Sequence, residues 1–231
     1  MRFSPQQRQW PVCIVSALVL AFCVHPAWVQ ATETTVGLGL GSSAGFGMQA
    51  DVTFEQFTRD LPLSLRLSSA YSGRNPGNAL DARRVFINDA TNGTPHKDGR
   101  TWLLRFDLLL PIARVDQTPV RLGVGARRAF FTGTFDFVGG NEKFDVTSKS
   151  WGVGAFLDIG FVMSSRLDFC LQLGFDHFFA ARLEGHDTAY EPDGDHVNAR
   201  NDYGWSEADA AVNQPSLEWF GLIGLRMRLG R

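Results

Sequence analysis

The sequence is poor in cysteine, in lysine and in long apolar runs. Its 231 residues include only three cysteines and three lysines. Cys13 and Cys23 lie in an N-terminal leader, so Cys170 is alone in the remaining chain. A single cysteine excludes an intramolecular disulfide and a thiolate metal site. Beyond the leader no apolar run is long enough for a membrane helix, so a membrane-spanning form of this chain must be a closed barrel.

The first 31 residues have the features of a secretory signal peptide. Arg2 and Arg8 form a positive n-region, residues 11–24 are apolar, and Val29-Gln30-Ala31 is a small-residue cleavage site. A membrane anchor is the alternative for this segment. Cleavage after Ala31 leaves 200 residues with 20 basic and 24 acidic side chains, a net charge of −4. This size fits one domain, 32–231, and this charge does not favour a nucleic-acid partner.

The rest of the chain alternates between apolar and polar residues with a period of two, which is typical of strands with two unlike faces. The clearest example is 217–229, where Glu218, Arg226 and Arg228 stand between apolar residues. Eight such segments predict strands at 34–41, 45–56, 62–72, 101–112, 119–137, 149–163, 166–185 and 216–229. In the fifth, the apolar phase switches near Arg127–Phe130, which indicates either a β-bulge or the end of a lipid-facing part.

The polar face of these segments carries arginine, carboxylates and glycine rather than the lysine expected of a water-facing sheet. Arginine forms planar, bidentate pairs with carboxylates, and glycine leaves room in a narrow interior. We therefore expect the polar face to line a lumen and the apolar face to contact lipid. The residues predicted to form lumen ion pairs are Asp51, Glu55, Arg66, Arg105, Asp107, Arg121, Asp158, Asp168, Asp176, Glu218, Arg226 and Arg228.

The predicted links alternate in length, which sets the orientation of the barrel. Links 57–61, 113–118 and 164–165 are short, and links 73–100, 138–148 and 186–215 are longer; the short link 42–44 has to be an outer turn. The predicted fold class is all-β, an eight-stranded antiparallel up-and-down transmembrane β-barrel with short periplasmic turns and longer external loops. Tyr71, Trp102, Trp151 and Trp219 then fall at the external end of the lipid-facing band, as interfacial aromatics.

The mature chain resembles the small eight-stranded outer-membrane proteins, such as the OmpA transmembrane domain and OmpX. The resemblance covers nearly all of it as architecture, and the closing Gly-Leu-Arg-Met-Arg-Leu is similar to the terminal strand signal of such barrels. That family usually ends on Phe or Trp, whereas this chain ends Leu229-Gly230-Arg231. The resemblance implies residence in the outer membrane, contact with its lipid, and recognition by the outer-membrane assembly machinery.

Two further features concern the external side. Arg127 and Arg128 are placed where the fifth strand leaves the outer leaflet, where arginine could pair with lipopolysaccharide phosphates as a fork; the alternative is one lumenal and one interfacial arginine. Loop 73–100 is net basic and loop 186–215 is acidic, so we expect them to dock electrostatically as a lid that contacts an extracellular partner. Taken alone, the acidic loop is expected to be solvated or disordered rather than to form a specific metal site.

The sequence favours a non-enzymatic integral outer-membrane protein whose lumen is closed by salt bridges, since an eight-stranded barrel is just wide enough for its own side chains. We assign no catalytic residue, no cofactor and no metal. Asp176 and His177 point to opposite faces, and Asp193-Gly194-Asp195 lacks the ordered ligand series of a calcium loop. The alternatives are a narrow porin-like channel for ions or small solutes, a lipid A-modifying barrel enzyme, and a soluble barrel of the lipocalin type.

Overall fold

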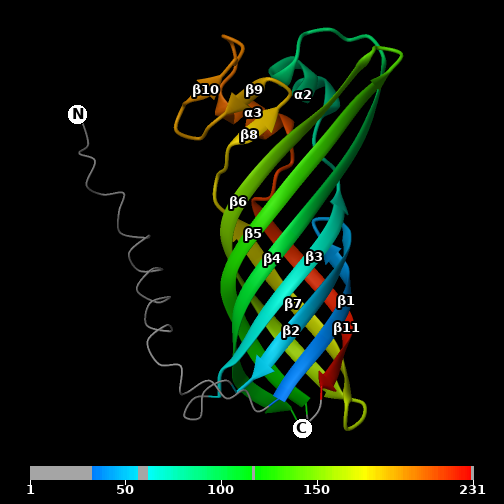
Figure 1. Cartoon of the computed structure of the whole chain (residues 1–231), viewed down its shortest axis with the longest axis vertical. Coiled ribbons are helices and arrows are strands. Elements are labelled where there is room, and N and C mark those ends of the chain that lie inside the picture. Colours follow the sequence, from blue (N-terminus) through cyan, green and yellow to red (C-terminus); the bar gives the residue numbers. More distant parts are fainter. Residues whose placement is uncertain (1–32, 57–61, 116–117, 230–231) are drawn as a thin grey trace, which may run out of the picture.

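The structure is a computed structural model that describes residues 33–56, 62–115 and 118–229. Eight antiparallel strands close into a barrel in which each strand pairs with its neighbour in the chain, while β11 pairs with both β7 and β1 (Figure 1). The predicted fold class is confirmed. The barrel strands are β1 (Glu33–Ser43), β2 (Phe46–Glu55), β3 (Ser64–Arg74), β4 (Thr94–Val115), β5 (Thr118–Val138), β6 (Glu142–Val162), β7 (Leu167–Phe178) and β11 (Leu217–Leu229). The predicted signal peptide, 1–31, lies outside the described residues, as do link 57–61 and residues 116–117 of link 113–118.

Both ends of the described chain lie at one end of the barrel, beside the turn between β6 and β7 (Figure 1). Thr34 there pairs with Leu229. At the opposite end, link 42–44 is a true turn, because β1 and β2 are joined only by Ala44 and Gly45 and Ala44 has a φ of 55°. The connections from β3 to β4, from β5 to β6 and from β7 to β11 also lie at this end, which we call the external end.

Several strand boundaries differ from the prediction. β4 and β6 begin seven residues earlier than predicted, so the expected loop 138–148 is mostly a long hairpin that turns at residues 139–141. The predicted strand 166–185 is wrong beyond Phe178, where the chain leaves the barrel wall. It returns as β8 (Leu183–Gly185), which pairs with the upper part of β6 instead of continuing β7.

The external connections fold into a lobe that packs against the extended ends of β5 and β6. The lobe contains α2 (Ala79–Phe86), β8, β9 (Thr188–Tyr190), β10 (His196–Val197) and α3 (Trp205–Ala211). Its core buries residues from both long connections and from the two strands: Ala79, Ala82, Val85, Phe86, Phe135, Phe137, Phe144, Val146, Leu183, Tyr190, Ala208, Ala211 and Val212. Loop 186–215 is therefore ordered and the disordered alternative is wrong, while its acidic side chains Asp187, Asp193, Asp195 and Asp202 are exposed to solvent. Neither helix of the described chain is long and apolar enough to cross a membrane.

The phase switch in β5 is explained by a change of surroundings and not by a bulge. Its odd-numbered residues face inward along the whole strand, and the pairing with β4 and β6 is unbroken around Arg127–Phe130. A register shift occurs elsewhere, between Pro111 and Ala113. Inside the barrel the inward positions are polar, glycine or alanine, whereas above it Phe135 and Phe137 enter the core of the lobe. The second explanation, the end of the lipid-facing part, is the one the structure supports.

Candidate functional site

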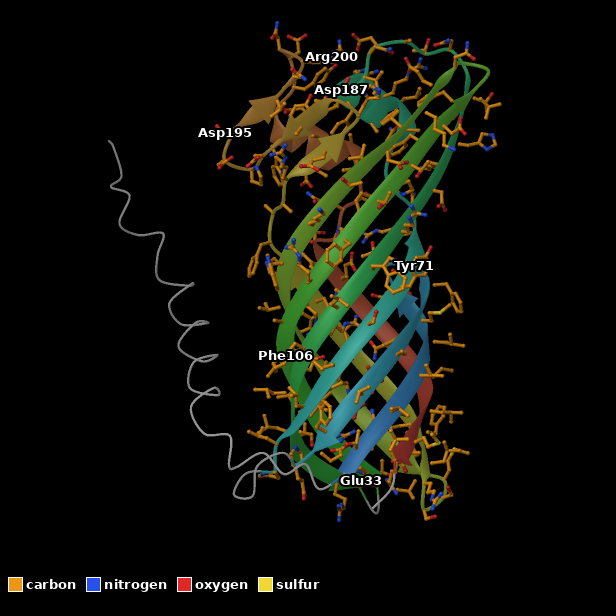
Figure 2. The ribbon with its side chains drawn as sticks, in the orientation of Figure 1. Glu33, Tyr71, Phe106, Asp187, Asp195 and Arg200 are labelled. Carbon is orange, nitrogen blue, oxygen red and sulfur yellow. The ribbon has the colours of Figure 1, made fainter. Side chains whose placement is uncertain are left out.

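The outer surface of the barrel is an apolar belt. Phe106 and Tyr71 point away from the barrel wall (Figure 2), and half of the Phe106 side chain is exposed. The predicted interfacial aromatics lie at the external edge of this belt, where Trp102, Trp151 and Trp219 are 52%, 60% and 71% exposed. Tyr71 packs edge-on against Trp102, with ring centroids 5.4 Å apart. A soluble protein does not expose so large a continuous apolar surface without a partner.

Inside the barrel, the carboxylate of Asp158 accepts hydrogen bonds from three arginines. Arg66 lies 3.1 Å away, Arg121 2.6 Å and Arg226 2.8 Å, measured from guanidinium nitrogen to carboxylate oxygen. Glu55 shares Arg121 at 2.8 Å. Asp158, Arg66 and Arg226 are buried, so this cluster fills the lumen nearer the chain ends and leaves its charges compensated by one another.

A second cluster lies nearer the external end, around Asp176 and Asp107. Arg105 and Arg127 both bind Asp176, at 2.8 Å and 2.5 Å, and Arg127 also lies 2.5 Å from Asp107. Arg105 additionally donates to Gln49. All four charged side chains are buried. Arg127 therefore bridges Asp107 and Asp176, Arg105 adds a second cation to Asp176, and the ion pairs link strands that are far apart in the sequence.

Further pairs stand at both ends of the lumen. Arg74 lies 2.5 Å from Glu218 at the external end, and Arg228 lies 2.7 Å from Asp168 beside the chain ends. Glu33 is 3.8 Å from Arg228. Asp51 is the remaining predicted acid, 3.6 Å from Arg66. The seven predicted lumen carboxylates thus meet seven arginines: the five predicted for the lumen, together with Arg74 and Arg127.

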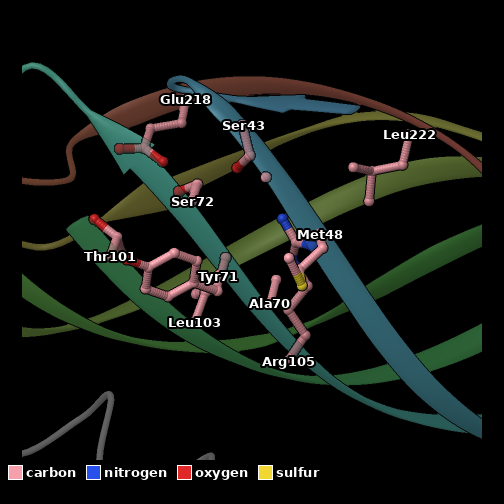
Figure 3. A pocket seen from close by; sticks show the side chains of 11 residues that line it. Ser43, Met48, Ala70, Tyr71, Ser72, Thr101, Leu103, Arg105, Glu218 and Leu222 are labelled. Carbon is pink, nitrogen blue, oxygen red and sulfur yellow. The ribbon is translucent and has the colours of Figure 1, made fainter. Parts of the chain in front are cut away.

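Buried apolar side chains lie beside both ion-pair clusters. Leu109, Phe156, Phe220 and Leu222 form a buried group in the lumen. The Arg105 guanidinium lies 4.4 Å from the Phe220 ring centroid and that of Arg66 lies 5.7 Å from the Phe156 ring. Figure 3 shows a pocket at the external end of the lumen, beneath Glu218 and Ser43, whose volume of about 10 Å³ has room for roughly one water molecule.

The placement of Arg127 at the lipopolysaccharide is wrong. Arg127 is fully buried in the lumen, because it has the parity of the inward residues of β5. Arg128, its neighbour, does point outward. Its guanidinium lies 4.7 Å from the Trp151 ring and 5.5 Å from the Phe130 ring, and it donates to the Lys149 carbonyl at 3.4 Å. Of the pair, only Arg128 is on the surface that lipid could reach.

Arg74 is a second lumen arginine that the sequence prediction did not include. The predicted third strand ended at residue 72, which assigned Arg74 to the basic external loop. The strand continues to Arg74, which has the same parity as the inward Arg66 and Ser68. Extending the alternation by one more inward position would have placed it in the lumen opposite Glu218.

The two external connections do dock, but chiefly through the apolar core of the lobe and not through the predicted charges. Arg83 is buried, pairs with Glu142 of β6, and lies 4.5 Å from the Phe137 ring. The ion pair between the connections has the reverse polarity: Arg200 of the acidic connection binds Asp89 of the basic one and donates to the Arg84 carbonyl at 2.6 Å. The hydrogen bond from Arg200 lowers the pKa of Asp89.

The lobe has a groove at its surface with a volume of about 580 Å³. It lies between the end of α2, the β5–β6 turn and the β8–β9 turn. Three of its lining residues, Asn141, His186 and Asn198, have positive φ values of 57°, 45° and 49°. Asp187, which Figure 2 shows on the lobe, also lines it; its carboxylate is 3.0 Å from His186 Nδ1 and its carbonyl accepts from Asn198. The groove presents amide, imidazole and carboxylate groups together.

The residues considered for catalysis and metal binding do not assemble into a site. Asp176 is buried in the lumen, whereas His177 faces outward and packs edge-on against Phe179. Asp193 and Asp195 lie on the exposed outer part of the lobe, where Asp195 is visible in Figure 2. Within residues 33–56, 62–115 and 118–229, no group of three or more His, Cys, Asp or Glu side chains could hold a metal ion.

Comparison with known proteins supports the fold. No family model matches the sequence, and no curated protein matches it. A major outer membrane protein from Thermus thermophilus superposes with a TM-score of 0.69 and 22% identity, over 87% of this chain and all of that one. Neisserial surface protein A (TM-score 0.36, 13% identity, 85% of this chain and 95% of that one) and Ail from Yersinia pestis (0.38, 12%, 85% and 97%) are also similar. The chain has the eight-stranded barrel fold of outer-membrane proteins.

Proposed function

We propose that the protein is an integral, non-enzymatic outer-membrane barrel, inserted by the outer-membrane assembly machinery, whose folded lobe is presented outside the cell. One observation carries this proposal: the apolar side chains of the barrel face outward and its ion pairs face inward. A lipocalin-type soluble barrel has the opposite arrangement. In lipid, a closed barrel satisfies every backbone hydrogen bond internally, which an open sheet cannot do.

The proposal is tested by fractionation and by gel mobility before and after boiling. The wild-type protein is expected to sediment with outer membranes and to change mobility on boiling. Leu225→Arg, in the apolar belt, should destabilise the inserted barrel by about 2–4 kcal/mol, the cost of an arginine on the lipid face at the bilayer midplane. Thr147→Arg, on the outward face of β6 above the belt, is the matched control and should behave as wild type. Processed protein found dissolved in the periplasm without detergent would overturn the proposal.

We also propose that the lumen is closed and that the barrel does not act as a porin-like channel. The support is the two buried ion-pair clusters and the buried apolar group that contacts an arginine of each. An ion would have to break paired, desolvated charges to pass through. Planar bilayer recordings should show no discrete conductance steps for the wild-type protein. Large, reproducible steps would favour the channel.

The lobe, built from 73–100 and 186–215, is proposed as the contact surface for an extracellular partner, with the groove as its centre. The probes are panels of immobilised glycans and matrix proteins, applied to cells that display the protein. At least one probe should bind, Asn198→Trp should reduce that binding by filling the groove, and Thr134→Trp, on the polar outward face of β5, should not. Absence of binding across both panels, or equal loss in both variants, would contradict this role.

A further inference from the structure

The outward faces of β4, β5 and β6 carry a patch of cations and aromatic rings at the external edge of the apolar belt. Strand pairing arranges the patch in three rows across these strands: Arg100–Thr132–Thr147, then Trp102–Phe130–Lys149, then Leu104–Arg128–Trp151. Each strand contributes one cation, and the three aromatic rings stand between them. No carboxylate occurs in these rows. We call Arg100, Arg128, Lys149, Trp102, Phe130 and Trp151 the rim patch.

The cations of the rim patch lack carboxylate partners, unlike the arginines of the lumen. Among the described residues, Arg100, Arg128 and Lys149 have no carboxylate oxygen within 4.0 Å, whereas all seven lumen arginines are paired. The nearest acids in the register are Asp98 and Asp145, one row further out, and Glu184 of β8, which pairs with Thr147. Asp145 accepts a hydrogen bond from Thr134 at 2.6 Å, and Glu184 lies 2.9 Å from Arg182. Unpaired cations beside an apolar belt require an anion from another molecule or water.

The aromatic rings hold one of these cations in a fixed position. Arg128 lies over both Trp151 and Phe130, at 4.7 Å and 5.5 Å from their centroids. A guanidinium stacked on rings has lost much of its freedom before any ligand arrives, so less entropy is lost when it binds a planar set of oxygens. Strand geometry places the Cα atoms of Arg128 and Lys149 roughly 8 Å apart, close enough for both side chains to reach one phosphate.

The rim patch is confined to one side of the barrel. The outward residues at the same end of β11, β1 and β2 include Leu217, Trp219, Phe46 and Met48, and none of them is lysine or arginine. Lys149, one of the three lysines of the chain, lies within the patch. A general requirement for charge at the membrane edge would distribute cations around the whole barrel. Their concentration indicates one preferred ligand position.

We propose that the rim patch binds a phosphorylated glycolipid of the outer leaflet, with its phosphate groups on Arg128, Lys149 and Arg100 and its acyl chains along the belt below Trp151 and Trp102. Guanidinium groups bind phosphate oxygens through two parallel hydrogen bonds, and lysine adds a point charge. The rings suit the boundary between acyl chains and headgroups. This inference rests on the proposed insertion into the outer membrane, which sets the patch at headgroup height.

The test is native mass spectrometry of the full chain in detergent, titrated with diphosphorylated lipid A. The triple variant Arg100→Gln, Arg128→Gln, Lys149→Gln should bind at least about tenfold more weakly, since it lacks all three cations that would hydrogen-bond to the phosphates. The control is Arg114→Gln, Arg166→Gln, which removes two cations from the opposite rim, where they also lack carboxylate partners among the described residues. The control should bind as wild type.

Two further arms identify the ligand. Lipid A from which both phosphates have been removed should bind wild type no better than it binds the triple variant. Inorganic phosphate at millimolar concentration should not displace lipid A; full displacement would overturn the lipid assignment. Equal affinity of wild type and triple variant, or equal loss in the control, would overturn the site. Each variant is first assayed for heat-modifiable mobility, so a failure of membrane insertion is seen separately from a failure to bind lipid.

Discussion

Arg127 Nε lies 2.5 Å from Asp176 Oδ1, and both side chains are fully buried in the lumen. The two residues are 49 positions apart, on β5 and β7, with β6 between them. Gly154 of β6 pairs with both Gly125 of β5 and Asp176 of β7, so no side chain stands between the charges. The missing side chain on the middle strand is what allows arginine and carboxylate to meet across it.

Arg127→Met is expected to destabilise the barrel by about 3–5 kcal/mol. The variant leaves Asp107 and Asp176 buried with one arginine fewer, and breaking a buried pair from one side costs this much. The double variant Arg127→Met, Asp107→Asn should recover part of the loss, because Asp176 keeps its ion pair with Arg105 and no buried carboxylate is left without a cation. The measurement is reversible urea unfolding in lipid vesicles. A loss below about 1 kcal/mol for Arg127→Met, typical of exposed pairs, would contradict the buried-cluster account.

Gly154→Ala should destabilise the barrel strongly, whereas Gly160→Ala should be tolerated. Both glycines lie on the lumen face of β6. A methyl group at Gly154 would meet Asp176 Oδ1 and would lie 2.6 Å from Arg127 Nε, so the ion pair would have to move. At Gly160 the nearest atoms are 3.8 Å and 3.9 Å away, which is ordinary contact. Urea midpoints of the two variants in vesicles provide the comparison, and equal midpoints would show that the space at Gly154 is not needed.

The barrel could be predicted from the sequence because lipid and lumen impose opposite chemistry on alternate residues over many strands. The faces of β2, β3 and β11 follow from this alternation alone. Arg127 was misplaced because the same inward parity of β5 changes from polar to apolar as the strand leaves the barrel. The apolar residues of β5 therefore shift from even-numbered to odd-numbered positions along the strand. The alternation of inward and outward side chains is nevertheless the same throughout.

The lobe could not be predicted in the same way, because its core is assembled from short elements with no long period. α2 has eight residues and β9 has three, too few for a periodic pattern to stand out. Their apolar residues are buried only because the extended hairpin of β5 and β6 supplies Phe135, Phe137 and Phe144 as a surface to pack on. Net charge suggested that the two connections meet, but it identified neither Arg83–Glu142 nor Asp89–Arg200 as the pairs formed.

Phe135→Ala is expected to loosen the lobe while leaving the barrel inserted. Phe135 is fully buried in the lobe core and stacks on Phe144 with centroids 5.4 Å apart. Removing a buried phenylalanine costs about 3–5 kcal/mol, and here the loss falls on the lobe alone. Trypsin should then cleave at Arg182 or Arg200 in intact cells, while heat-modifiable mobility is retained. Val138→Ala, 55% exposed at the hairpin tip, is the control and should resist trypsin as wild type does.

Acid should weaken the link between the two external connections through Asp89. The hydrogen bond from Arg200 lowers the pKa of Asp89 below its ordinary value of 3.8, so the link is fully present at neutral pH. Its contribution is lost as the pH falls below 3.8 and through the lower pKa of the folded state. The Asp89 side chain is exposed, so the effect should be local: NMR signals of the Arg200 side chain and of α3 should shift in this pH window while barrel signals stay constant.

Asp89→Asn should remove the shift. Asp81→Asn, an exposed carboxylate of α2 that lies 3.4 Å from Arg84, should leave it unchanged. A transition at the same pH in Asp89→Asn would assign the acid sensitivity to another carboxylate of the lobe.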